Sequence, residues 1–145
     1  MLYITLIIWL LLDFITKYLA TIYLKEKVSL VGDFVYLQLT YNPWIAFGIK
    51  VPFWLLKIWT LALIIWIYYY YRGELQQEKN PKKQNTLSFA FGLILAWAIW
   101  NGFERVLNER VIDFVWVQYF SIFNLADSFI SIWALLLIYY YYNKK

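Results

Sequence analysis

Four long apolar runs constrain the fold of this 145-residue chain more than any other feature. They lie at about 2–23, 52–71, 87–103 and 122–142, and each approaches the roughly 20 residues that a helix needs to cross the hydrocarbon layer of a bilayer. The whole chain is 63% hydrophobic, whereas a soluble domain is about 45–50% apolar. A soluble fold of this length could not bury so much apolar surface. We therefore expect an all-α membrane protein that forms a single domain, a bundle of four transmembrane helices.

The basic residues between the runs predict how such a bundle is oriented. With four spans, both termini and the polar segment at 72–86 lie on the same side of the membrane. We expect that side to be cytoplasmic, because cytoplasmic loops carry an excess of Lys and Arg. The segments at 24–51 and 104–121 would then face outside. The basic residues on the cytoplasmic side are Arg72, Lys79, Lys82, Lys83, Lys144 and Lys145, and those of the first outer segment are Lys25, Lys27 and Lys50.

The first apolar run has a second interpretation, a secretory signal peptide. Such a peptide begins with basic residues, but no Lys or Arg precedes this run. The run also continues past Asp13 and Lys17. We therefore expect a membrane span here.

Composition limits the chemistry that the chain can perform. It contains no Cys and no His, which excludes disulfides, thiol nucleophiles, Ser–His triads and the usual zinc sites. The net charge of +4 is modest and reflects basic loops of a membrane protein rather than nucleic-acid binding. Any catalysis must depend on carboxylates, Lys, Ser, Thr or Tyr.

The first outer segment contains FVYLQLTYN at 34–42, where apolar and polar side chains alternate in part. A period of two predicts a short amphipathic strand, which we expect to lie on the membrane surface. Asn42 ends this strand and precedes Pro43. It is either a turn residue, a common role for Asn before Pro, or a polar group that holds the backbone of a substrate.

Charged residues in and beside the apolar runs form two groups. Asp13 and Lys17 are four residues apart, so on a helix they share a face. A charge in a span is costly and faces protein or a wet cavity, and we expect this pair to give structural support rather than to act in catalysis. Asn101, Glu104 and Arg105 also share one helical face. They form either an interfacial cluster that ends the third run or a polar wall behind a site.

Two aspartates lie near the outer boundary of the spans. Asp113 follows the third run, and Asp127 lies about five residues inside the fourth, on the same helical face as Asn124. Two carboxylates that are brought together share one proton. Aspartic proteases use such a pair: one carboxylate activates water and the other polarises the peptide carbonyl. Two separately paired structural acids are an equally good interpretation of these residues by themselves.

An ordered set of motifs resembles the lipoprotein signal peptidase (signal peptidase II) family. Any one of them is weak, but their order, spacing and placement on the spans are highly specific, and they extend over nearly the whole chain. The motifs are D-x-x-T-K at 13–17, N-x-x-x-A-F at 42–47, N-x-x-E-R at 101–105, V-I-D-F at 111–114 and F-N-L-A-D at 123–127.

The resemblance implies a four-span aspartic peptidase of the bacterial inner membrane, with both termini cytoplasmic and the active site toward the outer face. Such an enzyme removes the signal peptide of diacylglyceryl-modified prolipoproteins, cutting before the lipid-bearing cysteine, and needs no cofactor or metal. The expected strand would belong to the small extracytoplasmic β-cradle of the family. The expected partners are the prolipoprotein substrate and membrane lipids, with no nucleic acid, and we expect a monomer. The resemblance assigns catalysis to Asp113 and Asp127 and support or substrate binding to Asp13, Lys17, Asn42, Asn101, Arg105 and Asn124.

The chain departs from the family pattern at several positions. Glu104 replaces the usual Asp, and Glu109 replaces a Gly. Four tryptophans also stand at positions where the family has glycine. One hypothesis is that the gene uses UGA codons that its source reads as glycine, and the rival is genuine aromatic enrichment, in which case Trp44 and Trp100 would obstruct the substrate cleft. The four tryptophans are Trp44, Trp97, Trp100 and Trp133.

Two other functions compete with the peptidase. One is a four-span binding or scaffold protein with an impaired site. The other is a small transporter or channel subunit, in which Asp13, Lys17 and Asp127 would form an intramembrane relay. The ordered motifs favour the peptidase.

Overall fold

A computed structural model describes residues 1–44, 51–120 and 122–143 of the chain. Its four helices, each long and apolar enough to cross a membrane, confirm the expected bundle. α3 lies at its centre and packs against the other three helices. The central place of α3 explains why 67% of its apolar window is buried, against 11–22% in the other three. The helices are α1 (Leu2–Tyr23), α2 (Phe53–Gln77), α3 (Pro81–Asn108) and α4 (Leu125–Tyr142).

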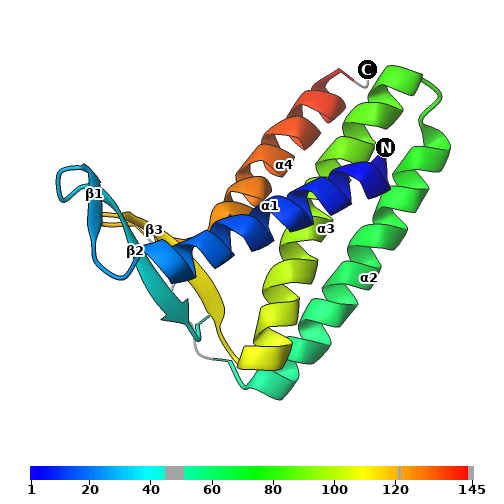
Figure 1. The fold of residues 1–145 in the computed structure, drawn as a ribbon. Coiled ribbons are helices and arrows are strands. Elements are labelled where there is room, and N and C mark those ends of the chain that lie inside the picture. The colour runs from blue at the N-terminus through cyan, green and yellow to red at the C-terminus, as the bar shows by residue number, and fades with distance from the viewer. Residues whose placement is uncertain (45–50, 121, 144–145) are drawn as a thin grey trace.

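A small antiparallel sheet lies at the end of the bundle opposite both termini (Figure 1). Its strands are β1 (Val28–Val31), β2 (Val35–Asn42), β3 (Val111–Val117) and β4 (Ile122–Phe123), in the order β1-β2-β3-β4. The strand expected at 34–42 is β2, while the other three strands were not predicted.

The register between β2 and β3 joins two segments that are distant in the sequence. Thr40 pairs with Asp113 and Asn42 with Val111, after an irregularity between Leu37 and Thr40. This pairing brings the end of the first outer segment beside the residues that follow α3.

The termini and the connection between α2 and α3 lie at the same end of the bundle, as predicted (Figure 1). The expected polar loop at 72–86 is mostly helical, however. α2 continues to Gln77, and α3 begins at Pro81, where Asn80 Oδ1 accepts a hydrogen bond from Lys82 N at 2.9 Å. Proline suits the first turn of a helix. Hydropathy identifies only the part of a helix that lies in hydrocarbon. The prediction of a polar loop therefore missed the polar helical turns at the end of α2 and the start of α3.

The boundaries of the third and fourth spans also differ from the prediction. α3 extends past the expected end at 103 to Asn108. The fourth span was expected from 122, but Ile122–Phe123 form β4 and α4 begins at Leu125. Asp127 therefore lies in the first turn of α4, not well inside a span.

The helices approach one another closely at two glycines of α3. A Cβ atom at Gly92 would lie 2.7 Å from Thr5 Cγ2 of α1, and one at Gly102 would collide with Thr60 of α2. The largest fully buried apolar side chains include Leu87, Phe91, Leu93, Phe129 and Tyr140.

Candidate active site

Polar side chains from α1, β2, α3, β3 and the start of α4 meet where the bundle reaches the sheet. Hydrogen bonds and ion pairs connect most of them into one network. The structure therefore brings together all the residues that the sequence predicted for the site. These are Asp13, Lys17, Asn42, Asn101, Arg105, Asp113, Asn124 and Asp127.

Asp113 is buried, with 3% of its surface exposed. Its Oδ2 accepts a hydrogen bond from Asn42 Nδ2 at 2.7 Å, and its Oδ1 accepts one from Asn124 Nδ2 at 2.7 Å. The pairing of β2 with β3 places Asn42 next to this carboxyl. Asn42 therefore does more than form a turn, since its side chain contacts one of the two predicted catalytic residues.

Asp127 is partly buried and accepts three hydrogen bonds from the described residues. Its Oδ1 accepts hydrogen bonds from Trp97 Nε1, at 2.8 Å, and from Asn101 Nδ2, at 3.2 Å. Its Oδ2 accepts a hydrogen bond from the backbone N–H of Asn124, at 3.1 Å. The sequence prediction did not include Trp97 as a partner. The sequence did offer a signal for this contact: Trp97 precedes Asn101 by four residues, and side chains four residues apart share a helical face.

Asn124 connects the two carboxyl groups. Its side-chain oxygen caps α4 by accepting from the backbone N–H of Asp127 at 3.1 Å. With the reciprocal bond from the backbone of Asn124 to Asp127, this forms a capping box. Its Nδ2 meanwhile donates to Asp113 Oδ1 and to Asn101 Oδ1. One fully buried side chain thus fixes Asp113 relative to Asp127.

Lys17 lies behind this pair, at the centre of a buried charge cluster. Its Nζ lies 2.8 Å from Asp13 Oδ2, 2.6 Å from Glu104 Oε2 and 2.8 Å from Asn101 Oδ1. Asp13 also accepts a hydrogen bond from the backbone N–H of Ala126, at 2.9 Å. The cluster therefore ties α1 and α3 to the first turn of α4.

Glu104, the departure from the family motif, pairs with Lys17 rather than with the adjacent Arg105. The Arg105 guanidinium donates to the backbone oxygens of Asn101, at 3.5 Å, and Trp44, at 3.3 Å. It is attracted electrostatically to Asp127, Asp113 and Glu104. Arg105 thus supplies positive charge near both aspartates without forming an ion pair with either among the described residues.

Burial is the main cause that raises the pKa of Asp113, to about 6. The hydrogen bonds from Asn42 and Asn124 oppose this rise, and the nearby charge of Asp127 adds to it. The carboxyl group of Asp113 therefore retains its proton at pH values where an exposed aspartate has lost it.

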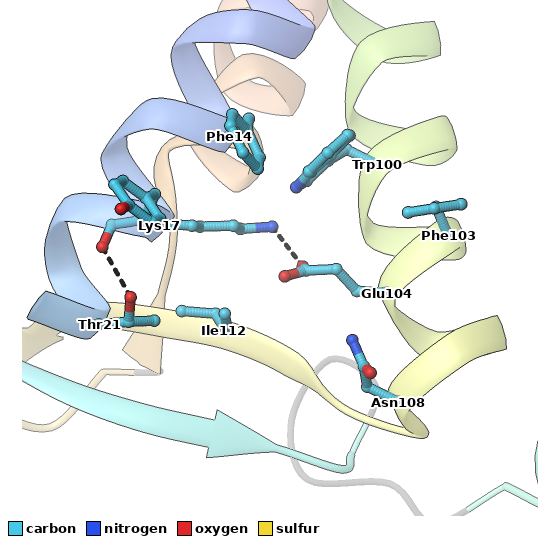
Figure 2. Close-up of a pocket in the computed structure, with 9 residues that line it drawn as sticks. Phe14, Lys17, Thr21, Trp100, Phe103, Glu104, Asn108 and Ile112 are labelled. Carbon is cyan, nitrogen blue, oxygen red and sulfur yellow. Dashed lines mark hydrogen bonds and ion pairs between the residues drawn. The ribbon is translucent and has the colours of Figure 1, made fainter.

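A cavity of about 250 Å³ lies beside the charge cluster, between α1 and α3 (Figure 2). Phe14, Trp100 and Phe103 form aromatic parts of its lining, and the Lys17–Glu104 pair lies at its polar side. Trp100 Nε1 is buried and has no hydrogen-bond partner within the described part of the chain. The same is true of Trp133 Nε1.

No group of three or more acidic side chains among residues 1–44, 51–120 and 122–143 could hold a metal ion. The arrangement around Asp113 and Asp127 consists instead of two carboxyl groups held by amides. It can hold a protonated and an ionised carboxyl side by side, which suits general acid–base chemistry on a peptide bond.

A family model described as signal peptidase (SPase) II matches residues 5–143. The chain belongs to the signal peptidase II family. A lipoprotein signal peptidase of Chlorobium phaeobacteroides (strain BS1) is 33% identical in an alignment that covers 90% of this chain and 88% of that protein. A lipoprotein signal peptidase of Halalkalibacterium halodurans is 35% identical in an alignment that covers 87% of this chain and 81% of that protein.

Two solved structures have a similar fold. A bacterial membrane enzyme determined by the in meso method matches with a TM-score of 0.82 and 25% identity, covering 99% of this chain and 91% of that one. A second such enzyme matches with a TM-score of 0.79 at 24% identity, covering 99% and 94%. The second likeness concerns the fold alone.

Proposed function

We propose that this multi-pass membrane protein removes the signal peptide of lipid-modified prolipoproteins, with Asp113 and Asp127 as its catalytic pair. The observation that carries the proposal is that Asn124 hydrogen-bonds both aspartates, one in β3 and the other in the first turn of α4. The family and its named relatives support the substrate class.

The reaction needs a water molecule between two carboxyl groups in different protonation states. The ionised carboxylate takes a proton from the water, which attacks the scissile carbonyl carbon. The protonated carboxyl donates a hydrogen bond to the carbonyl oxygen, where negative charge develops. The peptide C–N bond then breaks, its electron pair remains on nitrogen, and the nitrogen takes the proton that the first carboxylate received from water. The low exposure of Asp113 supports its role as the protonated carboxyl, because a buried carboxyl group tends to remain protonated.

The surrounding residues would serve as supports. Asn42, Asn101 and Asn124 would orient the carboxyl groups through their amides. Asp13 and Lys17 would hold the start of α4 in place, and Arg105 would provide positive charge beside the substrate backbone.

We place the site at the outer face of the bacterial inner membrane, with both termini in the cytoplasm. The termini share one end of the bundle with the connection between α2 and α3, which Arg72, Lys82 and Lys83 flank, and the sheet lies at the other end (Figure 1). Asp113 belongs to β3 of that sheet, and Asp127 lies in the first turn of α4, just after β4. The positive-inside rule favours this orientation. There the acyl chains of a substrate could remain in the bilayer while water reaches the scissile bond.

The test is cleavage of a diacylated prolipoprotein by purified protein in which Asp113→Asn or Asp127→Asn has been introduced. Each variant should fold but lose cleavage. Asp33→Asn is the matched control, because Asp33 is exposed and pairs with Lys27 between β1 and β2, so its replacement should leave the rate unchanged. Cleavage by either active-site variant at a rate near wild type would refute the assignment.

A further inference from the structure

The cavity between α1 and α3 is separate from the two aspartates. Ile112 of β3 lines it, whereas the side chain of Asp113, the next residue, belongs to the opposite face of the strand, because successive side chains alternate. Neither Asp113 nor Asp127 is among the described residues that line it. The buried ion pair of Lys17 and Glu104 forms its polar wall (Figure 2). The cavity is therefore a second site, on the other face of β3.

The border of the cavity faces the membrane. Three aromatic side chains of its lining are about half exposed: Phe14 at 47%, Tyr18 at 56% and Phe103 at 51%. They belong to α1 and α3, which are both long and apolar enough to cross a bilayer. Tyrosine in particular favours the membrane interface. Lipid therefore has access to the cavity from the side of the bundle.

The depth of the cavity corresponds to the ester groups of a bilayer. α3 has 28 residues and is about 42 Å long, which matches the roughly 40–45 Å of a bilayer with its headgroups. The residues of α3 that line the cavity, from Trp100 to Asn108, cover about the last 12 Å of that length. At this depth the headgroup layer meets the hydrocarbon, and ester groups join the acyl chains to glycerol.

Trp100 supplies a polar contact for a ligand. Its indole nitrogen points into the cavity, on the side of Lys17 (Figure 2), and its N–H has no acceptor within the part of the chain that the structure describes. Phe14 and Phe103 hold the indole, with ring centroids at 5.4 and 5.7 Å. A buried N–H without an acceptor is unfavourable, and an acyl chain offers none. A suitable ligand therefore presents an acceptor beside an apolar chain.

We propose that this cavity binds a phospholipid of the bilayer, whose ester carbonyl oxygen accepts a hydrogen bond from Trp100 Nε1 while its acyl chain packs against Phe14 and Phe103. The lipid of a prolipoprotein is a different one. In the proposed reaction its diacylglyceryl cysteine adjoins the scissile bond, on the face of β3 that carries Asp113. The site requires tryptophan at position 100, because glycine there would remove the donor.

Two lipids that differ only in their linkage test the hydrogen bond. Purified, delipidated protein is incubated with dioleoyl phosphatidylglycerol or with its diether analogue, which lacks both carbonyl oxygens, and native mass spectrometry measures the bound lipid. Wild type should bind the ester lipid about 2- to 10-fold more tightly, the range expected for one hydrogen bond. Trp100→Phe should lose this preference. Equal binding of the two lipids by wild type, or a preference that persists in Trp100→Phe, would overturn the proposal.

Trp133→Phe is the matched control for this substitution. Trp133 Nε1 is also buried without a partner among the described residues, but Trp133 does not belong to the lining of the cavity. The preference for the ester lipid should therefore remain.

Filling the cavity tests its position without a change at Trp100. Thr21→Phe adds a ring at an exposed position of the lining, on α1, and should abolish the preference for the ester lipid. Ile22→Phe is the control, since Ile22 is exposed on the same helix and lies outside the lining, and it should keep the preference. A full preference in Thr21→Phe would place the lipid elsewhere and overturn the proposal. Because lipid binding is the quantity measured, these results do not depend on peptidase activity.

Discussion

Asn124 Nδ2 lies 2.7 Å from Oδ1 of Asp113, a residue that is 11 positions earlier in the chain and belongs to another element. The same asparagine caps the helix that carries Asp127. Helix capping and alignment of the two carboxyl groups therefore depend on one side chain.

Asn124→Ser should separate these two roles. Serine is a good N-cap residue, so the apparent unfolding temperature should change little. Its short side chain cannot donate to Asp113, and leaving a buried polar group without its hydrogen-bond partner costs about 1–3 kcal/mol. We expect kcat to fall by about 10- to 100-fold, measured on a lipidated prolipoprotein. A variant with normal kcat would show that the amide does not align the pair.

Lys17→Met should destabilise the protein by about 3–5 kcal/mol, because it leaves the buried carboxylates of Asp13 and Glu104 without their cation. Unfolding in detergent measures the loss. Lys27→Met is the control, since the Lys27–Asp33 pair is exposed and such pairs contribute about 0–1 kcal/mol. Equal losses in the two variants would contradict the importance of the buried cluster.

The raised pKa of Asp113 predicts how stability depends on pH. The folded protein binds this proton up to a pH of about 6, whereas the unfolded chain releases it near the ordinary value of 3.8. The contribution of Asp113 is therefore fully present below pH 3.8 and is lost as the pH rises through about 6. A shift of this size corresponds to at most about 3 kcal/mol.

Unfolding temperatures at pH 4 and pH 7 measure this effect. Wild type should lose more stability over that interval than Asp113→Asn, which has no titrating group at this position. Parallel pH dependence of the two proteins would show that Asp113 has an ordinary pKa.

Gly92→Ala should destabilise the contact between α1 and α3 by about 1–3 kcal/mol, because the new methyl group would meet Thr5 Cγ2. Combination with Thr5→Ser, which removes that methyl group, should restore part of the stability. Gly73→Ala is the control, since nothing lies within 4 Å of its Cβ position and alanine favours a helix. Unfolding temperatures that rise in both alanine variants would disprove the close contact.

The recoding hypothesis predicts UGA codons at positions 44, 97, 100 and 133 of the gene, and glycine in the corresponding peptides of protein from its natural source. UGG codons there would refute it. The buried N–H groups of Trp100 and Trp133 lack partners among the described residues, which is unfavourable for an indole. Glycine at 97 would remove one donor to Asp127 but leave those of Asn101 and Asn124.

The sequence by itself determined the four spans, because about 20 apolar residues in a row satisfy the bilayer whatever they pack against. It also determined β2, through alternation, and its ordered motifs named the polar residues that the structure brings together. It placed the helix ends poorly, since polar turns beyond the hydrocarbon carry no hydropathy signal. β1 and β3 pair with β2, and β4 pairs with β3, so these three strands depend on pairing and not on their own pattern.

Only the tertiary structure decided which polar groups touch. Spacing showed that Asp13 and Lys17 share a face, but not that Glu104 completes their cluster. It could not show that Trp97 donates to Asp127, nor that Asn42 reaches Asp113. The reason is physical: periodicity fixes neighbours within one helix or strand, whereas these contacts join separate elements whose relative placement depends on the packing of the whole bundle against the sheet.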